Sequence, residues 1–208
     1  LLSVLSVKGF AGGGGTVTAS FTATTVCAGT NTILNSTSTT TSGNIISWNW
    51  DLDNDGSYDD ATGADLLHIF PSSGIFPVGL QVTTDQSQTA STSMNVNVSP
   101  FPDVSFMATD VCKGEPTSFM DMSSIATGSN VSWNWDFDSD SYFDDGNGQT
   151  ISHDFQNSGT YTTGLQVTSD MGCTAQVYNN VTVNPVPNAT FTFENVCIGE
   201  LTHFTATA

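Results

Sequence analysis

Positive charge is almost absent from this chain of 208 residues. Lys8 and Lys113 are the only basic side chains, there is no arginine, and the formal net charge is −18. Binding to a nucleic-acid backbone or to an anionic membrane surface depends on lysine and arginine. The sequence therefore excludes both classes of partner, and its charge instead favours cations as ligands, or simply solubility.

Long apolar runs and helix-forming residues are also missing. No stretch of eighteen apolar residues occurs, so we predict no segment that inserts into a membrane. Lysine, glutamate, arginine and alanine are scarce, and the chain is dominated by threonine, serine, asparagine, valine and glycine, which are typical of strands and turns. The composition indicates an all-β protein.

What the chain does contain is an internal repeat with a constant step and no gap. The step is the interval from Cys27 to Cys112, and the interval from Cys112 to Cys197 has the same length. The same step relates Trp48 to Trp133, Trp50 to Trp135, His68 to His153, Gly74 to Gly159, Pro100 to Pro185, and Phe21 to Phe106 and Phe191. We predict two complete modules, 16–100 and 101–185, followed at 186–208 by the start of a truncated third module.

Within one module, alternating apolar residues predict six or seven short strands. In the first module the strands are expected near 17–24, 31–37, 44–52, 65–70, 75–84 and 89–98. This number and spacing favour tandem antiparallel β-sandwich modules of immunoglobulin or fibronectin III type. Trp48 and Trp50 alternate with Asn49, so both tryptophans are expected to face the core between the sheets.

The order of motifs resembles the polycystic kidney disease (PKD) repeat in its bacterial surface or secreted-protein form. The resemblance rests on WNWDF followed by an acidic loop, on HDFQNSGTYTTGLQVTSDMGC at 153–173, and on VCKGE near the start of a module. It implies a β-sandwich that serves as a spacer or as a protein- or glycan-binding module in long extracellular proteins. One difference is that a compact W-x-F-G-D-G turn is usual in the family, whereas this chain carries longer, aspartate-rich loops.

These two loops, WNWDLDNDGSYDD at 48–60 and WNWDFDSDSYFDD at 133–145, hold half of the acidic residues. Alternating carboxylates followed by a glycine let the backbone curl so that several oxygens converge, as a hard cation requires. An EF-hand is rejected because Thr62 and Asn147 stand where its bidentate glutamate should be. The expected ligands are Asp51, Asp53, Asp55, Asp59 and Asp60 in the first loop, and Asp136, Asp138, Asp140, Asp144 and Asp145 in the second.

Calcium is the expected ion, because magnesium prefers fewer protein ligands and retains its waters. Five carboxylates within one loop repel one another, so without a counterion some would have to protonate or the loop would open. The alternative is that each loop is a solvated acidic turn that keeps the protein soluble.

The four cysteines indicate an oxidising, exported setting. The family resemblance implies a disulfide between Cys112 and Cys173, early and late in the second module. In the first module the position of Cys173 is taken by Gln88, so Cys27 is expected to be unpaired in its own module. Cys27 is then either a small buried thiol or bonded to another chain. Cys197 is also expected to be unpaired within 186–208, its partner belonging to the missing part of the truncated module.

Nothing in the sequence indicates catalysis. The motifs G-x-S-x-G and H-E-x-x-H do not occur, and the three glutamates, Glu115, Glu194 and Glu200, are not paired within a module. His68 and His153 occupy equivalent strand positions, so we expect a role in packing or hydrogen bonding. The chain is therefore predicted not to be an enzyme.

Residues 1–15, LLSVLSVKGFAGGGG, do not follow the repeat and read as an apolar strand with a glycine hinge. Three interpretations stay open: the relic of a signal peptide, a donor strand for the sheet edge of a neighbouring molecule, or the last strand of a preceding domain.

Together these observations predict an extracellular or cell-surface protein segment. We expect calcium-stiffened modules of a large bacterial adhesin or filament, with copies of the chain or another surface protein or glycan as partner. The alternative is a set of non-catalytic binding or spacer modules of a secreted polysaccharide- or protein-degrading enzyme.

Overall fold

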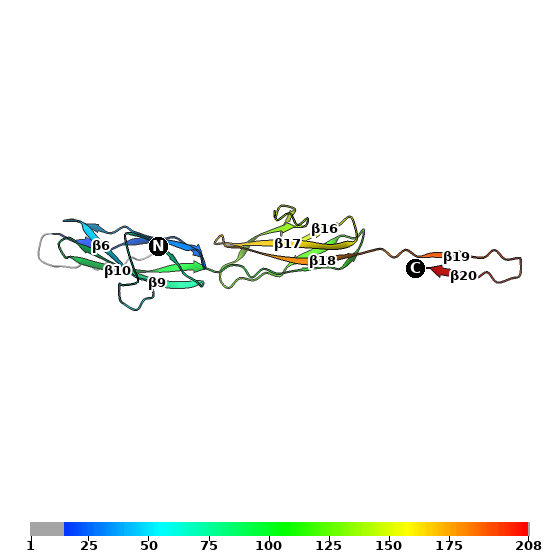
Figure 1. The fold of residues 1–208 in the computed structure, drawn as a ribbon, viewed down its shortest axis with the longest axis horizontal. Helices are drawn as coiled ribbons and strands as arrows, with labels where there is room; N and C mark the ends of the chain where they lie inside the picture. Colours follow the sequence, from blue (N-terminus) through cyan, green and yellow to red (C-terminus); the bar gives the residue numbers. More distant parts are fainter. Residues whose placement is uncertain (1–14, 208) are drawn as a thin grey trace. The chain divides into compact units, whose positions relative to one another are not determined.

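The computed structural model describes residues 15–207, and within this range the chain forms strands and turns without a helix (Figure 1). The predicted all-β class is thus confirmed. None of the described elements could span a membrane as a helix. The expectations for the N-terminal segment fall on residues 1–14, outside the described range, apart from Gly15.

The strands of the first repeat are β1 (Val17–Thr18), β2 (Phe21–Ala23), β3 (Val26–Cys27), β4 (Asn31–Ser36), β5 (Thr39–Thr40), β6 (Ile45–Asp51), β7 (Ala61–Thr62), β8 (Asp65–Ile69), β9 (Gly74–Thr84) and β10 (Thr89–Ser99). Those of the second repeat are β11 (Phe106–Ala108), β12 (Val111–Cys112), β13 (Thr117–Asp121), β14 (Asn130–Asp136), β15 (Gly146–Asn147), β16 (Thr150–His153), β17 (Gly159–Ser169) and β18 (Thr174–Asn184). After residue 185 the hairpin of β19 (Thr190–Phe193) and β20 (Phe204–Thr207) follows.

Each repeat builds the same pair of sheets. In the first, a five-stranded sheet has the order β3-β10-β9-β6-β7 and a three-stranded sheet the order β2-β4-β8. In the second, the corresponding orders are β12-β18-β17-β14-β15 and β11-β13-β16. In the first repeat the strand pairs are antiparallel except β3 with β10, which is parallel, and the equivalent pair of the second repeat, β12 with β18, is parallel too. The prediction of tandem β-sandwiches is confirmed.

One predicted strand, 17–24, is divided in two. β1 pairs with β5, whereas β2 pairs with β4 in the three-stranded sheet. Both Val17 and Phe21 are nevertheless buried, so the bend between the two strands lets one short segment contribute apolar side chains from two edges. Sequence alternation does not reveal such a division, because the period of two continues through it.

Trp50 and Trp135 lie at the centre of the two cores, and both are fully buried. Trp50 packs edge-to-face on Phe21, and Trp135 packs in the same way on Phe106, with ring centroids 5.0 and 5.1 Å apart. Trp48 is half-buried against the same core as Trp50. The expectation that both tryptophans of a strand face the core is therefore correct.

The chain divides into two compact units whose limits differ from those of the sequence repeats. The first unit contains the described residues up to Asp103 together with Ile125–Val131 and Thr168–Ala175. The second contains Val104–Ser124, Ser132–Val167 and the residues from Gln176 onward. The turn that carries Cys173 thus belongs to the first unit, although its sequence lies in the second repeat.

Candidate metal centre

The aspartate loops connect the last residue of a central strand to a short edge strand. β6 ends at Asp51 and β7 begins at Ala61, where the amide of Asp60 donates to the carbonyl of Trp50 at 3.1 Å. The indole Nε1 of Trp50 donates to the carbonyl of Gly63 at 2.9 Å. Because the buried indole holds the far side of the loop, the acidic residues between Asp51 and Asp60 are kept at the edge of the core.

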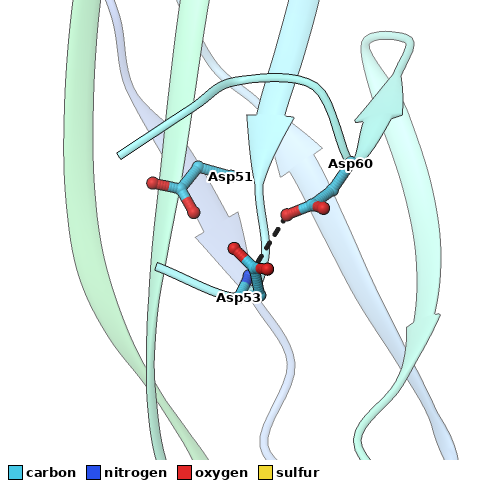
Figure 2. Close-up of side chains that lie close together, drawn as sticks. All are labelled: Asp51, Asp53 and Asp60. Atoms are coloured by element: carbon cyan, nitrogen blue, oxygen red, sulfur yellow. Dashed lines mark hydrogen bonds between the residues drawn. The ribbon is translucent and has the colours of Figure 1, made fainter. Parts of the chain in front are cut away.

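Three carboxylates of the first loop converge on one point. Oxygens of Asp51, Asp53 and Asp60 all lie within 4.8 Å of one another, and Figure 2 shows the three side chains facing a common space. The second loop brings Asp136, Asp138 and Asp145 together in the same way. Each trio comes from the strand end, the loop and the residue before the edge strand.

Backbone amides hold the third carboxylate of each trio in place. Oδ2 of Asp60 accepts hydrogen bonds from the amides of Leu52 at 2.6 Å and Asp53 at 3.2 Å. Oδ2 of Asp145 accepts from the amides of Phe137 and Asp138 at the same two distances. The two loops therefore share one backbone path, as their sequences suggest.

The first carboxylate of each trio is buried, and here the loops differ. Asp51 is 5% exposed and accepts one bond, from the amide of Gly56 to Oδ2 at 3.2 Å. Its Oδ1 is buried without a hydrogen-bond partner among the described residues. A buried carboxylate oxygen without a donor is costly, because desolvation disfavours its charge and nothing compensates for it.

In the second loop the equivalent carboxylate, Asp136, has donors on both oxygens. The amide of Ser139 donates to Oδ1 at 2.7 Å, and the amide of Ser141 to Oδ2 at 3.1 Å. The hydroxyl of Tyr178 also donates to Oδ2, at 3.3 Å. Asp136 is fully buried, so these donors provide the stabilisation that Asp51 lacks on one side.

A glycine on the neighbouring strand makes room for the buried carboxylate of the first loop. Gly79 of β9 lies opposite Asp51 in the antiparallel register. A Cβ at this position would lie 3.0 Å from a ring carbon of Tyr58 and 3.2 Å from the Cβ of Asp51. Gly164 is equally covered, by Phe143 and Tyr178. The aromatic ring thus packs on the backbone beside the carboxylate and limits its movement.

The donor set fits a hard divalent cation. Calcium takes six to eight oxygens at about 2.3–2.6 Å, so two ligands on opposite sides of the ion lie roughly 5 Å apart. Three carboxylate oxygens within 4.8 Å of one another match that spacing. The unpartnered Oδ1 of Asp51 is the further observation in favour of a cation, since a positive charge would supply the partner that the protein does not.

The remaining predicted ligands lie outside both trios. Oδ1 of Asp55 accepts from the amide of Ser57 at 2.7 Å, and Oδ1 of Asp140 from the amide of Tyr142 at 2.8 Å. Asp59 and Asp144 are exposed. Metal binding by these four aspartates stays a prediction, and the geometry groups only the trios.

The surroundings of Asp138 shift the pKa of its carboxyl group. The amide of Asp140 is the largest influence on the pKa of Asp138 and lowers it. Desolvation and the carboxylates of Asp140, Asp145 and Asp136 act the other way and together raise this pKa above its ordinary value. Desolvation, followed by the charge of Asp136, raises the pKa of Tyr178, so its hydroxyl stays protonated and can donate.

Sequence reasoning missed the position of the histidines relative to the carboxylates. His68 lines a pocket together with Asp53 and Asp60, and His153 lines the equivalent pocket with Asp138. Burial lowers the pKa of both imidazoles, although Asp60 opposes this shift at His68 and Asp145 and Asp154 oppose it at His153. The one sequence signal for this position is that the histidines recur at the step of the repeat, and that recurrence by itself indicates only a role in packing. Packing is part of their role, since His153 stacks on Phe137 with centroids 4.3 Å apart.

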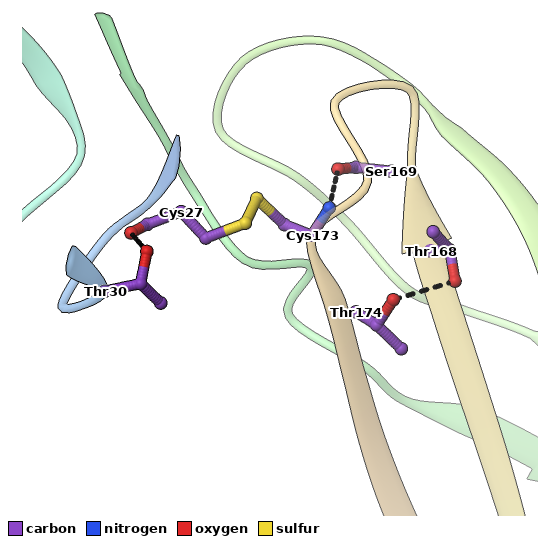
Figure 3. Close-up of a disulfide and its surroundings, with 6 residues drawn as sticks. All are labelled: Cys27, Thr30, Thr168, Ser169, Cys173 and Thr174. Atoms are coloured by element: carbon purple, nitrogen blue, oxygen red, sulfur yellow. Dashed lines mark hydrogen bonds between the residues drawn. A yellow bond between two sulfur atoms is a disulfide. The ribbon is translucent and has the colours of Figure 1, made fainter. Parts of the chain in front are cut away.

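The disulfide differs from the one that the family resemblance implied. Cys173 is bonded to Cys27, 146 residues away, and not to Cys112 (Figure 3). Cys112 and Cys197 are exposed free thiols. The turn containing Cys173 packs within the first compact unit, which explains the pairing. Cys27 indeed has no partner in its own repeat, but the expectation of a buried thiol or a bond to another chain was wrong.

Comparisons with known proteins identify the family of this chain. The PKD domain family matches the chain twice, over residues 16–99 and 97–185. The PKD1 domain of Vibrio anguillarum Epp is 26% identical over 41% of this chain and 96% of that domain, with a TM-score of 0.36. The PKD1 domain of the Vibrio cholerae metalloprotease PrtV is 23% identical over 40% of this chain and 98% of that domain, with a TM-score of 0.35.

A third solved structure, of the fibronectin(III)-like modules of Clostridium thermocellum CbhA, is 13% identical and covers 81% of this chain and 94% of its own, with a TM-score of 0.41. The comparison with curated proteins gives no match. PKD domains are generally non-catalytic modules, typical of extracellular or secreted bacterial proteins. Because the family match extends over most of the sequence, from residue 16 to residue 185, the chain belongs to the PKD domain family as a tandem pair of domains.

Proposed function

We propose that this chain is a structural segment of a secreted or cell-surface bacterial adhesin or filament, whose PKD domains are stiffened by calcium. The observation that carries the proposal is the recurrence of one three-carboxylate cluster at the same loop of both domains. A cation held by Asp51, Asp53 and Asp60 would join the end of β6 to the start of β7. Asp136, Asp138 and Asp145 would join β14 to β15 in the same way.

The charge balance of the chain supports a bound cation. Each trio brings three carboxylates together in a protein that has two basic residues. Bringing like charges within a few ångströms is unfavourable in a partly desolvated site. Desolvation and, after it, the charges of the neighbouring carboxylates raise the pKa of Asp138. A divalent cation would remove the repulsion between the carboxylates and would make the strand ends harder to separate.

A stiff module suits a role in extension and assembly rather than in chemistry. The disulfide between Cys27 and Cys173 adds a covalent restraint that closes a long loop of the chain. Such restraints limit the states available to the unfolded protein and are common where a secreted protein must endure outside the cell. Copies of the chain, or another surface protein or glycan, are the partners that this role implies.

Calcium-dependent unfolding tests the proposal most directly. The 208-residue chain is unfolded by heat, followed by tryptophan fluorescence, in calcium, in magnesium and in chelator. Calcium at 100 times its dissociation constant stabilises an occupied domain by about 2.7 kcal/mol. The matched control is the double variant Asp51→Asn and Asp136→Asn, whose unfolding temperature we expect to rise much less in calcium than that of the wild type.

Electron microscopy of the native material at its cell surface then tests the assembly. Fibres or stalks that loosen on chelation support a calcium-stiffened structural protein. An unfolding temperature that calcium leaves unchanged would contradict the metal site and leave the loops as solubilising turns. Isolated particles unaffected by chelation would contradict the filament and favour the accessory domain of a secreted enzyme.

A further inference from the structure

The local structure that presents Cys27 to its partner is built again around Cys112. Cys27 ends β3, which pairs in parallel with β10 so that Cys27 lies beside Ser99. Cys112 ends β12, which pairs in parallel with β18 so that Cys112 lies beside Asn184. The residue after each cysteine then donates to the same neighbouring strand, Ala28 to Ser99 at 2.9 Å and Lys113 to Asn184 at 2.8 Å.

The turn that follows each early cysteine is also the same. The carbonyl of Cys27 accepts from the amide of Thr30 at 3.1 Å, and that of Cys112 from the amide of Glu115 at 3.0 Å. The intervening glycines, Gly29 and Gly114, have φ angles of +72° and +94°, in the left-handed region. The backbone around Cys112 therefore makes the same hydrogen bonds as the backbone around the disulfide-bonded Cys27.

The turn that supplies the other cysteine is likewise shared by both repeats. Ser169 donates its amide to the carbonyl of Cys173 at 2.9 Å, and its hydroxyl accepts from the Cys173 amide at 3.1 Å. In the first repeat Thr84 makes both contacts with Gln88, at the same distances. The turn is a constant part of the fold, and only the residue at its end decides whether a thiol is offered.

Because Cys173 is bonded to Cys27, this sequence contains no second cysteine at the end of such a turn that could pair with Cys112. Cys173 is the only cysteine at such a position, and it is bonded to Cys27. Gln88 occupies the other turn and cannot form a disulfide, and its side chain donates to the carbonyl of Gly15 at 3.0 Å. Cys112 itself is exposed and free, so its sulfur can be reached by a turn from another repeat.

Part of the surface that the cysteine turn lines in the first unit recurs in the second repeat. In the first unit, Asp170 and Met171 of the cysteine turn line a pocket together with Gly74, Ile75 and Val98. The positions one repeat step later are occupied by Gly159, Thr160 and Val183, at the ends of β17 and β18. The edge that receives the turn thus keeps its glycine and its valine in the second repeat.

We propose that Cys112 is a disulfide site for the turn cysteine of a further copy of the PKD repeat. The early cysteine of one repeat takes the late cysteine of the next, at the separation of 146 residues seen between Cys27 and Cys173. This rule replaces the pairing within one repeat that the family resemblance implied. It links successive domains covalently, whether or not the aspartate loops bind calcium.

The bond forms by thiol–disulfide exchange. The two cysteine thiols lose two protons and two electrons as the sulfur–sulfur bond forms. The electrons reduce one disulfide of a thiol–disulfide oxidoreductase, or of oxidised glutathione in a test tube, to two thiols.

The test uses the chain with its residues 186–208 replaced by a second copy of residues 101–185, refolded with reduced and oxidised glutathione. The appended copy alone carries Lys113→Arg, so that the peptide of its early cysteine differs in mass from the otherwise identical peptide of Cys112. Free thiols are alkylated, and the unreduced protein is cut before aspartate and mapped by mass spectrometry. Trypsin is unsuitable because the chain has two basic residues. We expect two linked peptide pairs, Cys27 with Cys173, and Cys112 with the late cysteine of the appended copy. The early cysteine of the appended copy is then alkylated.

The matched control replaces the late cysteine of the appended copy by glutamine, the residue that the first repeat carries at position 88. Cys112 should then be alkylated while the bond between Cys27 and Cys173 persists. Two results would overturn the proposal. One is a bond between Cys112 and Cys173, which lie in one repeat. The other is alkylation of Cys112 despite the late cysteine, in a sample whose Cys27–Cys173 bond proves that it has folded.

Discussion

The two aspartate loops share a backbone path but satisfy their buried carboxylates differently. In the second loop the amides of Ser139 and Ser141 and the hydroxyl of Tyr178 all donate to Asp136. In the first loop Asp51 has a single donor, the amide of Gly56, and its Oδ1 has none among the described residues. The buried carboxylate of the second loop therefore has protein donors on both oxygens, whereas that of the first loop has a protein donor on Oδ2 alone among the described residues.

This difference teaches that the repeat preserves the backbone of the loop but not every donor around its buried carboxylate. The tyrosine at 178 corresponds to Ser93 in the first repeat, whose shorter side chain cannot replace it at the carboxylate. Because hydrogen bonds and a cation compete for the same oxygens, we infer that the first loop binds calcium more tightly than the second.

The largest expected effect comes from removing the buried carboxylates in chelator. Asp136→Ala leaves three donors without an acceptor and should lower the free energy of unfolding by about 3 kcal/mol. Asp51→Ala removes one hydrogen bond together with an unpartnered buried oxygen, and should cost about 1 kcal/mol or less. Chemical denaturation of both variants in chelator measures the difference. Equal losses would contradict the contrast between the loops.

For calcium binding we expect the opposite order, with the larger loss from the substitution at Asp51. Asp51→Asn is expected to weaken binding at the first loop at least tenfold, which is about 1.4 kcal/mol. Asp136→Asn should change the total calcium binding less, because its loop is the weaker site. Isothermal titration of the wild-type chain and both variants tests this, with Asp103→Asn, outside either loop, as the control. A larger loss from Asp136→Asn than from Asp51→Asn would show that the loops are ranked wrongly.

Exchanging the turn residues at 56 and 141 should change the free energy of unfolding of each domain by about 1 kcal/mol, in opposite directions. Ser141 has a φ of +72°, whereas its counterpart in the first loop is a glycine, Gly56, with a φ of +90°. The left-handed region costs a residue with a side chain about 1 kcal/mol, so Ser141→Gly should stabilise the second domain and Gly56→Ser should destabilise the first. Thermal unfolding in chelator measures both. Shifts of the same sign in the two variants would disprove this account of the turn.

The smallest expected effect is a loss of stability from the two histidines as the pH falls from about 7.5 to about 5.5. Burial lowers the pKa of His68 and His153 below 6.5, so between the two pKa values the unfolded chain binds more protons than the folded one. The contribution of the two neutral histidines to the free energy of unfolding is complete above the ordinary histidine pKa of 6.5. It is lost as the pH falls through that value. Denaturation in chelator at a series of pH values measures it. The variant His68→Gln with His153→Gln should have the flatter profile, and a profile as steep as that of the wild type would assign the pH dependence to other groups.

Much of the fold follows from local pattern. The alternation of Trp48 and Trp50 with polar neighbours placed both tryptophans on the core side, and the constant step between the cysteines predicted two copies of one sandwich. The convergence of Asp51, Asp53 and Asp60 was predicted in part, since the loop sequence indicated converging carboxylates. The exact trio was not predictable, because it depends on which backbone amides reach Asp60 across the loop.

By itself the sequence determined the all-β class, the tandem repeat and the position of the acidic loops, because side-chain alternation and turn residues act over a few positions. The tertiary structure decided which buried carboxylate has donors, since Tyr178 reaches Asp136 from a strand 42 residues away. It also decided that Cys173 bonds to Cys27 and not to Cys112. A disulfide requires two Cβ atoms within about 4.5 Å, and that distance depends on how the turn at 168–175 packs.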